Sequence, residues 1–332
     1  MRDKQASQAL LKVRDLSVSF TTDEGEVEAL DRVSFDIARG EILGLVGESG
    51  CGKSVSAFSV MRLLPRPMGR ITNGKILLDT KDLLTLTKEE IRKIRGKEIG
   101  MIFQEPMNAL NPVKKIGEQI AEVFLLHQGV SHRQALDLAI GMLDEVGISD
   151  PANRALEYPH QLSGGMRQRV VIAMALACKP KLIIADEPTT ALDVTVQAQI
   201  LDLLQNLQKK NGSSILLITH DLGVIAENCD QVCVMYAGRI VERASVQTLF
   251  KNPIHAYTRG LMASIPRMDG IPKNKLMTIP GIVPALSQLD QGCRFAPRSG
   301  LSHPVNSLQR RPPYKEVASG HWVEACPVCT KI

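Results

Sequence analysis

Residues 47–54 read Gly-Glu-Ser-Gly-Cys-Gly-Lys-Ser and directly follow a strand-like stretch at residues 41–46. The spacing G-x-x-x-x-G-K-S is that of a phosphate-binding loop, which joins a strand to a helix. Its glycines let successive backbone N–H groups point inward at phosphate oxygens. The helix expected after Ser54 turns its positive end toward the same phosphates. The simpler interpretation, a glycine-rich turn before a helix, is disfavoured by the preceding strand.

Two side chains at the end of this loop add specific chemistry. Lys53 offers a positive charge to the β- and γ-phosphates of a nucleotide, and Ser54 offers a hydroxyl to Mg²⁺. A nucleoside triphosphate with Mg²⁺ is therefore the expected ligand. The loop residues expected to surround its phosphates are Gly47, Glu48, Ser49, Gly50, Cys51, Gly52, Lys53 and Ser54.

Composition narrows the class of protein further. The chain has 332 residues, of which 44% are hydrophobic and 23% charged, so it can bury a sizeable core. Its net charge of +5 is mild, does not by itself indicate nucleic acid, and suits a protein beside an anionic membrane surface. The longest apolar run, residues 170–178, is too short to cross a bilayer, and the N-terminus has no signal-peptide core. We therefore expect a cytoplasmic protein.

Hydrophobic periodicity predicts an α/β fold with an antiparallel β subdomain, an inserted helical subdomain and a C-terminal extension. Alternating residues between 11 and 37 predict an antiparallel β subdomain, and residues 112–158 have the apolar spacing of helices. Continuous apolar runs at 182–186 and 214–219 predict buried parallel strands. Prolines and glycines become frequent after about residue 266. We predict a main domain at residues 1–265, with a helical subdomain at about 105–160, and a loop-rich C-terminal extension at 266–332.

Polar side chains stand where these strands end. Asp186 closes the strand at 182–186 and is placed to hold Mg²⁺, and Glu187 is the candidate that polarises the attacking water; the alternative is a helix N-cap pair before a proline. Gln104 can ligate Mg²⁺ or orient water, although an ordinary loop glutamine fits the pattern as well. His220 follows the strand at 214–219 and can reach the γ-phosphate, or can instead cap the next helix.

A second anion-binding pattern lies at residues 162–169. Ser163, Gly164 and Gly165 open a helix, whose N-terminal N–H groups attract an anion. Because the chain already has a complete phosphate loop, this second site makes sense if it serves the nucleotide of a partner subunit.

Taken together, these segments resemble the ATP-binding-cassette ATPases, with their Walker A, Q-loop, signature, Walker B, D-loop and H-loop in order. The similarity covers about residues 10–265 and includes the D-loop at residues 191–193. It implies an ABC-type nucleotide-binding domain of the P-loop class that hydrolyses ATP. It also implies that two cassettes pack head to tail, with ATP between the Walker A of one and the signature of the other. By the same resemblance Phe20 stacks on adenine, or else is a core aromatic, and Asp193 couples the two sites.

Further segments are similar to the ATPases of bacterial dipeptide and oligopeptide importers. They are residues 103–112, 158–166, 185–199, 254–258 and 279–284. This implies a peripheral protein on the cytoplasmic face of the membrane, with two permease subunits, an extracellular binding protein and a second, distinct ATPase chain, and without nucleic acid. Residues 105–125 would contact the permease, or would only pack within the helical subdomain. Nickel or antimicrobial peptides are alternative cargoes. A soluble non-transport ATPase is a less favoured alternative.

The C-terminal cysteines depart from the importer pattern. Several relatives carry four cysteines here that bind an iron–sulfur cluster; Cys293 and Cys326 fit the first and fourth positions, Ser299 stands at the second, and Asn306 or Ser307 at the third. A [4Fe–4S] cluster usually requires four thiolates. A zinc site of Cys293, Cys326 and Cys329 with His303 or His321 is an alternative, and bare thiols are another.

Overall fold

The computed structural model describes residues 9–23, 25–105, 109–190, 192–265, 278–285, 288–289 and 291–330. The chain divides into two compact units. The first consists mainly of residues 85–218 with the segment 37–41, and the second of residues 11–36, 42–84 and 219–332. None of the helices among the described residues has both the length and the apolarity that crossing a bilayer demands.

The first unit combines a parallel sheet with a group of helices. Its strands are β6 (Ile99–Ile102), β7 (Leu182–Asp186) and β8 (Ser214–Thr219), in the order β6-β7-β8 and all parallel. Every residue of β7 and β8 is buried, as the two continuous apolar runs predict. The α/β class and these parallel strands are therefore confirmed.

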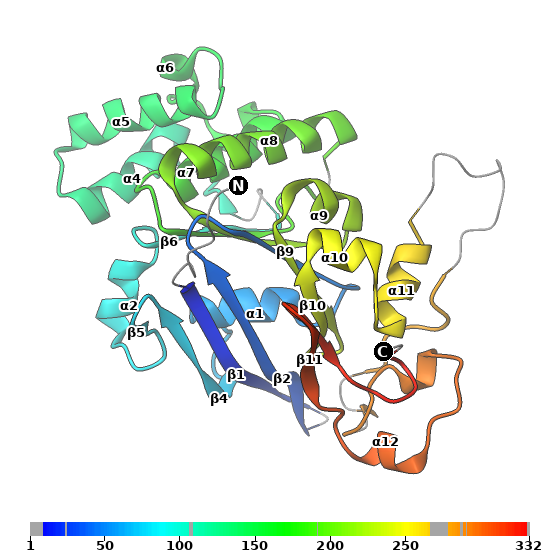
Figure 1. The fold of residues 1–332 in the computed structure, drawn as a ribbon. Helices are drawn as coiled ribbons and strands as arrows, with labels where there is room; N and C mark the ends of the chain where they lie inside the picture. The colour runs from blue at the N-terminus through cyan, green and yellow to red at the C-terminus, as the bar shows by residue number, and fades with distance from the viewer. Residues whose placement is uncertain are drawn as a thin grey trace. The chain divides into compact units, whose positions relative to one another are not determined.

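Helices fill most of the remaining length of this unit. They are α2 (Lys88–Ile94), α4 (Ile116–Gln128), α5 (His132–Glu145), α6 (Pro151–Arg154), the short 3₁₀ turn η1 (Pro159–Gln161), α7 (Gly164–Leu176) and α8 (Val194–Asn211). Helices α4, α5 and α7 pack on one another, and Figure 1 shows them in green. Serine and glutamine at the start of α5 form a capping box, in which Ser131 accepts from the N–H of Gln134.

The second unit contains a mixed arrangement of strands. One sheet has the order β2 (Gly25–Ala38), β1 (Ala9–Thr22), β4 (Gly69–Leu78) and β5 (Lys81–Asp82). In the other, β3 (Ile42–Val46) pairs in parallel with β9 (Gln231–Tyr236), which forms a hairpin with β10 (Arg239–Ser245). The hairpin turn, Ala237 and Gly238, has φ values of 44° and 81°, as a tight two-residue β-turn requires.

Short helices complete the second unit. These are α1 (Lys53–Val60), α9 (Leu222–Asn228), α10 (Val246–Lys251), α11 (Ala256–Ala263), the 3₁₀ turn η3 (Ala296–Arg298) and α12 (Val305–Gln309).

The C-terminal region holds more regular structure than its sequence indicates. Strand β12 (His321–Glu324) pairs with β10, and β11 (Tyr314–Ala318) pairs with β12, both antiparallel (Figure 1). Phe295, Cys293 and Cys326 pack in the same core as Tyr236 of β9. The prediction of a loop-rich extension therefore missed two strands. The domain boundary at 265/266 stays a prediction, since residues 266–277 lie outside the described residues.

Candidate nucleotide site

The phosphate loop stands between the buried strand β3 and the start of α1, as its spacing predicts. Gly47 has no room for a side chain, because an added Cβ would lie 2.1 Å from the carbonyl oxygen of Met235. Gly52 precedes α1 with φ of 106°, a conformation that L side chains rarely adopt. These two positions explain why the backbone bends here and why its N–H groups can face an anion.

Lys53 is 5% exposed and interacts with the loop that it terminates. Its Nζ donates to the carbonyl oxygens of Gly47 at 2.8 Å and Glu48 at 3.1 Å. The ammonium group is thus held beside the loop, where a phosphate charge would be attracted to it. Burial raises the pKa of Cys51 to about 11, so this thiol stays protonated at neutral pH and is a poor nucleophile.

The side chain of Glu48 in this loop has partners from the C-terminal region. Arg298 donates to both carboxylate oxygens, at 2.6 and 2.9 Å, and the backbone N–H of Glu48 donates to the hydroxyl of Tyr257 at 2.9 Å. Arg298 also donates to the carbonyl oxygen of Pro280 at 2.8 Å. The hydrogen bonds to Glu48 raise the pKa of Arg298. Neither Arg298 nor Tyr257 is marked as a site residue by the sequence, because no local pattern indicates contacts across 250 and 209 residues.

In the first unit, the predicted Gln104 and Glu187 lie together. The amide nitrogen of Gln104 donates to Oε2 of Glu187 at 3.2 Å, and the hydroxyl of Thr190 donates to the same oxygen at 3.0 Å. Glu187 has a φ of 46°, which is strained for a residue with a side chain. Its backbone N–H donates to the carbonyl oxygen of Ile218 at 2.9 Å, which holds this conformation. Asp186, at the end of β7, is 2% exposed.

Ser163 is the N-cap of α7, and its hydroxyl accepts from the N–H of Met166 at 3.3 Å. Ser163 and Gly164 are exposed, whereas a Cβ on Gly165 would lie 3.0 Å from Cγ1 of Val196. Asp193 caps α8 by accepting from the N–H of Val196 at 2.9 Å. The signature segment and the start of α8 therefore meet at Val196; Ala191 of the D-loop lies outside the described residues.

His220 and Phe20 belong to the second unit. His220 is exposed, and the helix that follows it is capped by Asp221, which accepts from the N–H of Gly223 at 2.7 Å. The capping alternative for His220 is therefore wrong. Phe20 is half-buried on β1 opposite Gly69, where an added Cβ would lie 2.8 Å from its ring.

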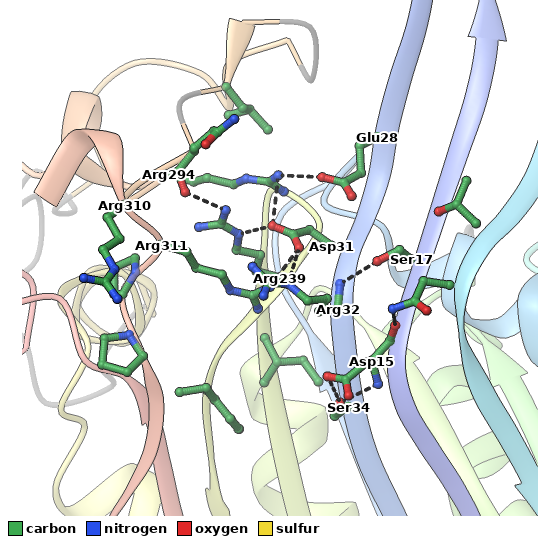
Figure 2. A pocket seen from close by; sticks show the side chains of 18 of the residues that line it. Asp15, Ser17, Glu28, Asp31, Arg32, Ser34, Arg239, Arg294, Arg310 and Arg311 are labelled. Atoms are coloured by element: carbon green, nitrogen blue, oxygen red, sulfur yellow. Dashed lines mark hydrogen bonds and ion pairs between the residues drawn. The ribbon is translucent and has the colours of Figure 1, made fainter.

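A wide charged pocket of about 1210 Å³ lies elsewhere in the second unit (Figure 2). At its centre Asp31, 7% exposed, accepts from Arg239 and Arg311, each at 2.8 Å, and from Arg294 at 3.4 Å. Arg239 also donates to the carbonyl oxygen of Gly292 at 2.6 Å. These hydrogen bonds attach the C-terminal region to β2 and β10.

Burial and charge act in opposite directions on Asp31. Burial raises the pKa of its carboxyl, but the guanidinium groups of Arg239, Arg311 and Arg294 outweigh burial and leave the pKa below its usual value. Asp31 is therefore ionised whenever the folded protein is at neutral pH.

A parallel sheet with this glycine loop between strand and helix defines the class of protein as a P-loop nucleoside triphosphatase. The family model described as ABC transporter matches residues 30–190. The model described as oligopeptide/dipeptide transporter, C-terminal region, matches residues 241–304.

Two individual relatives are similar in sequence to almost the whole chain. The oligopeptide transport ATP-binding protein OppD of Bacillus subtilis is 50% identical over 316 residues, 95% of this chain and 88% of that protein. The probable peptide ABC transporter ATP-binding protein y4tR of Sinorhizobium fredii is 49% identical over 321 residues, 97% of this chain and 96% of that protein. Among solved structures, the dimeric ATP-binding cassette MJ0796 bound to ADP and Pi is similar with a TM-score of 0.64 and 28% identity, covering 71% of this chain and 98% of that one.

The chain belongs to the ATP-binding-cassette transporter ATPases, in the oligopeptide and dipeptide transporter group. It is accordingly an ATP hydrolase coupled to transport, as the motifs predicted.

Proposed function

We propose that this chain binds and hydrolyses ATP to power the import of di- and oligopeptides through membrane permease subunits. The observation that carries the proposal is the joint presence of the complete phosphate loop at residues 47–54 and the peptide-transporter C-terminal region at 241–304. The relatives OppD and y4tR are named as peptide-transport proteins, and this chain is similar to them over 88% and 96% of their length. Their names support peptides over nickel as cargo.

The phosphate loop and Lys53 would bind the triphosphate of ATP through backbone N–H groups and the ammonium charge. The hydroxyl of Ser54, the amide oxygen of Gln104 and the carboxylate of Asp186 are oxygen donors of the kind that Mg²⁺ prefers, so these residues fit the ion. When bound, Mg²⁺ neutralises charge on the phosphate oxygens. Phe20 would stack on the adenine.

Glu187 is the proposed general base for the attacking water. Its carboxylate is positioned by Gln104 and Thr190, and its strained backbone fixes the direction in which it points. His220 would contact the γ-phosphate. Glu187 therefore carries the chemical step, while the other residues position the substrate and stabilise its charge.

A second chain would complete each site. The exposed Ser163 and Gly164 at the start of α7 can offer N–H groups to the ATP held by a partner's phosphate loop, and Asp193 lies near the same segment through Val196. ATP binding would then close two ATPase chains and hydrolysis would release them, so that the differential affinity of ATP for the two states drives transport. We expect the second chain to be a distinct homologue.

The remaining subunits would lie in and beyond the membrane. Two permease subunits and an extracellular binding protein complete the importer, and this chain would sit peripherally on the cytoplasmic face. Val113, which is 79% exposed just before α4, offers an apolar contact for a permease within the segment 105–125.

Uptake measurements test the proposed cargo. In a strain that lacks this gene, accumulation of a labelled tripeptide falls, and the wild-type chain restores it whereas the Glu187→Gln variant does not. The exposed Glu227→Gln variant on α9 is the matched control and restores uptake fully. Unchanged tripeptide uptake in the deletion strain, with accumulation of nickel lost instead, would contradict the peptide assignment.

A further inference from the structure

The four-cysteine iron–sulfur pattern does not fit this chain. Ser299 stands at the second expected position, where its hydroxyl donates to the carbonyl oxygen of Ala296 at 2.9 Å and accepts from the N–H of Leu301 at 3.1 Å. Ser307, at the third, donates to the carbonyl oxygen of Pro304 at 2.7 Å. Both hydroxyl groups are therefore hydrogen-bonded to nearby backbone groups. Because a [4Fe–4S] cluster takes a thiolate on each of its irons, the three cysteines of this region are one too few.

A different set of donors converges in the same place. We propose that the C-terminal region holds one structural Zn²⁺ ion on the side chains of Cys293, His303, Cys326 and Cys329. Their ligand atoms all lie within 4.8 Å of one another, and the three cysteines are buried. Three sulfurs and one imidazole nitrogen are a set that structural zinc sites use.

The distances suit a single ion. A tetrahedron with Zn–S bonds of about 2.3 Å separates two sulfur ligands by about 3.8 Å. The Sγ atoms of Cys293 and Cys329 are 3.7 Å apart, and Nε2 of His303 lies 3.2 Å from Sγ of Cys329. A cubane of four irons would instead hold its thiolates on separate metals, farther apart than these donors lie.

The surroundings of the donors are those of a metal site. Nδ1 of His303 lies 3.0 Å from the carbonyl oxygen of Leu301, which suits a proton on Nδ1 and leaves Nε2 facing the sulfurs. The N–H of Cys329 donates to Sγ of Cys326 at 3.5 Å within the C-x-x-C turn. The other candidate, His321, is instead bound to Glu242 at 2.8 Å, so the structure selects His303.

The site is joined to the phosphate loop by short connections. The carbonyl oxygen of Cys293 accepts from the N–H of Ala296, at the start of the turn that carries Arg298. The carbonyl oxygen of Cys329 accepts from the N–H of Ala256 at 2.7 Å, at the start of the helix that carries Tyr257. The two residues that bind Glu48 are therefore both anchored on ligands of the proposed ion, which gives zinc a role in ordering the loop.

Metal analysis of the full chain, purified without oxygen and without added metal, tests the site. We expect one zinc and no iron per chain, and we expect Co²⁺ added to the stripped protein to give the visible absorption of a tetrahedral thiolate site. Cys326→Ser weakens Zn²⁺ binding at least about tenfold, measured against a competing chelator. Cys178→Ser, a half-buried cysteine outside the cluster, is the matched control and leaves Zn²⁺ binding unchanged.

Should Cys326→Ser fail to fold, His303→Ala gives the same comparison, since His303 is only half-buried. Four irons per chain would overturn the proposal. So would an anaerobically purified chain that takes up neither Zn²⁺ nor Co²⁺, or an intact Cys293–Cys329 disulfide found under the same conditions. Stripping the zinc should also weaken ATP binding; unchanged ATP affinity would remove the link to Glu48 but not the ion.

Discussion

Glu187→Gln lowers ATP turnover by about 10²- to 10⁴-fold, the contribution typical of a general base, while ATP binding is retained. The hydrogen bonds that Gln104 and Thr190 donate to Glu187 both end on Oε2, so a glutamine whose amide oxygen takes that position keeps these two contacts. The substitution therefore removes the basic charge and leaves the geometry. Steady-state phosphate release and binding of labelled ATP measure the two effects separately.

Glu227→Gln, an exposed glutamate on α9, is the control and keeps wild-type turnover. The variant Glu187→Gln should also accumulate as a closed dimer in ATP, because binding without hydrolysis leaves the chains associated. Wild-type phosphate release from Glu187→Gln would remove this residue from the chemical step, and loss of ATP binding would show that its role is structural.

Asp31→Asn lowers the free energy of unfolding by about 3–5 kcal/mol, as expected when one partner of a buried ion network is removed. The substitution preserves shape but leaves the guanidinium groups of Arg239, Arg294 and Arg311 close together without the charge that they share. Urea unfolding of the two proteins at neutral pH measures the difference. Asp137→Asn, exposed on α5, is the control and changes stability by less than about 0.5 kcal/mol.

The same pair of proteins has a defined pH dependence. The folded-state pKa of Asp31 is lowered, so its stabilising contribution is complete above the ordinary carboxyl pKa of about 3.9 and is lost as the pH falls toward the folded-state value. The difference in the free energy of unfolding between wild type and Asp31→Asn should therefore decrease only below a pH of about 3.9. If the difference in the free energy of unfolding were the same above and below the pH range in which Asp31 titrates, the ion network would not be the cause of the lost stability.

Sequence alone predicted the parts of this molecule whose chemistry is fixed by local spacing. Gly47 and Gly52 occupy positions that a side chain would obstruct or strain, and the run at 182–186 is buried on every residue. Each of these features depends on neighbours within a few residues. That is why the phosphate loop, its strand and the α/β class could be read directly from the chain.

Long-range pairings could not be predicted in this way. Strand β12 joins the edge of β10 about 80 residues earlier in the chain. Arg298 reaches Glu48 across 250 residues. The sequence offers His303 and His321 as alternative ligands beside the cysteines, but no spacing chooses between them, whereas the structure groups His303 with the three sulfurs. The alternating patterns of β11 and β12 are too short to stand out among prolines, so the sequence predicts a loop-rich tail where the structure has two strands.

We propose that each ATP is held by the phosphate loop of one chain and the signature segment of another. The most direct test of this two-chain site is a dilution series in which ATP turnover per chain is measured with and without the second ATPase subunit. Sedimentation of the same samples shows whether the chains are associated. We expect turnover to fall as the chains dissociate, and to be lost in Ser163→Arg, whereas Ser131→Arg, which removes an equivalent helix cap on α5, retains it. Full turnover from a chain that sediments as a monomer, or from Ser163→Arg, would contradict the two-chain site.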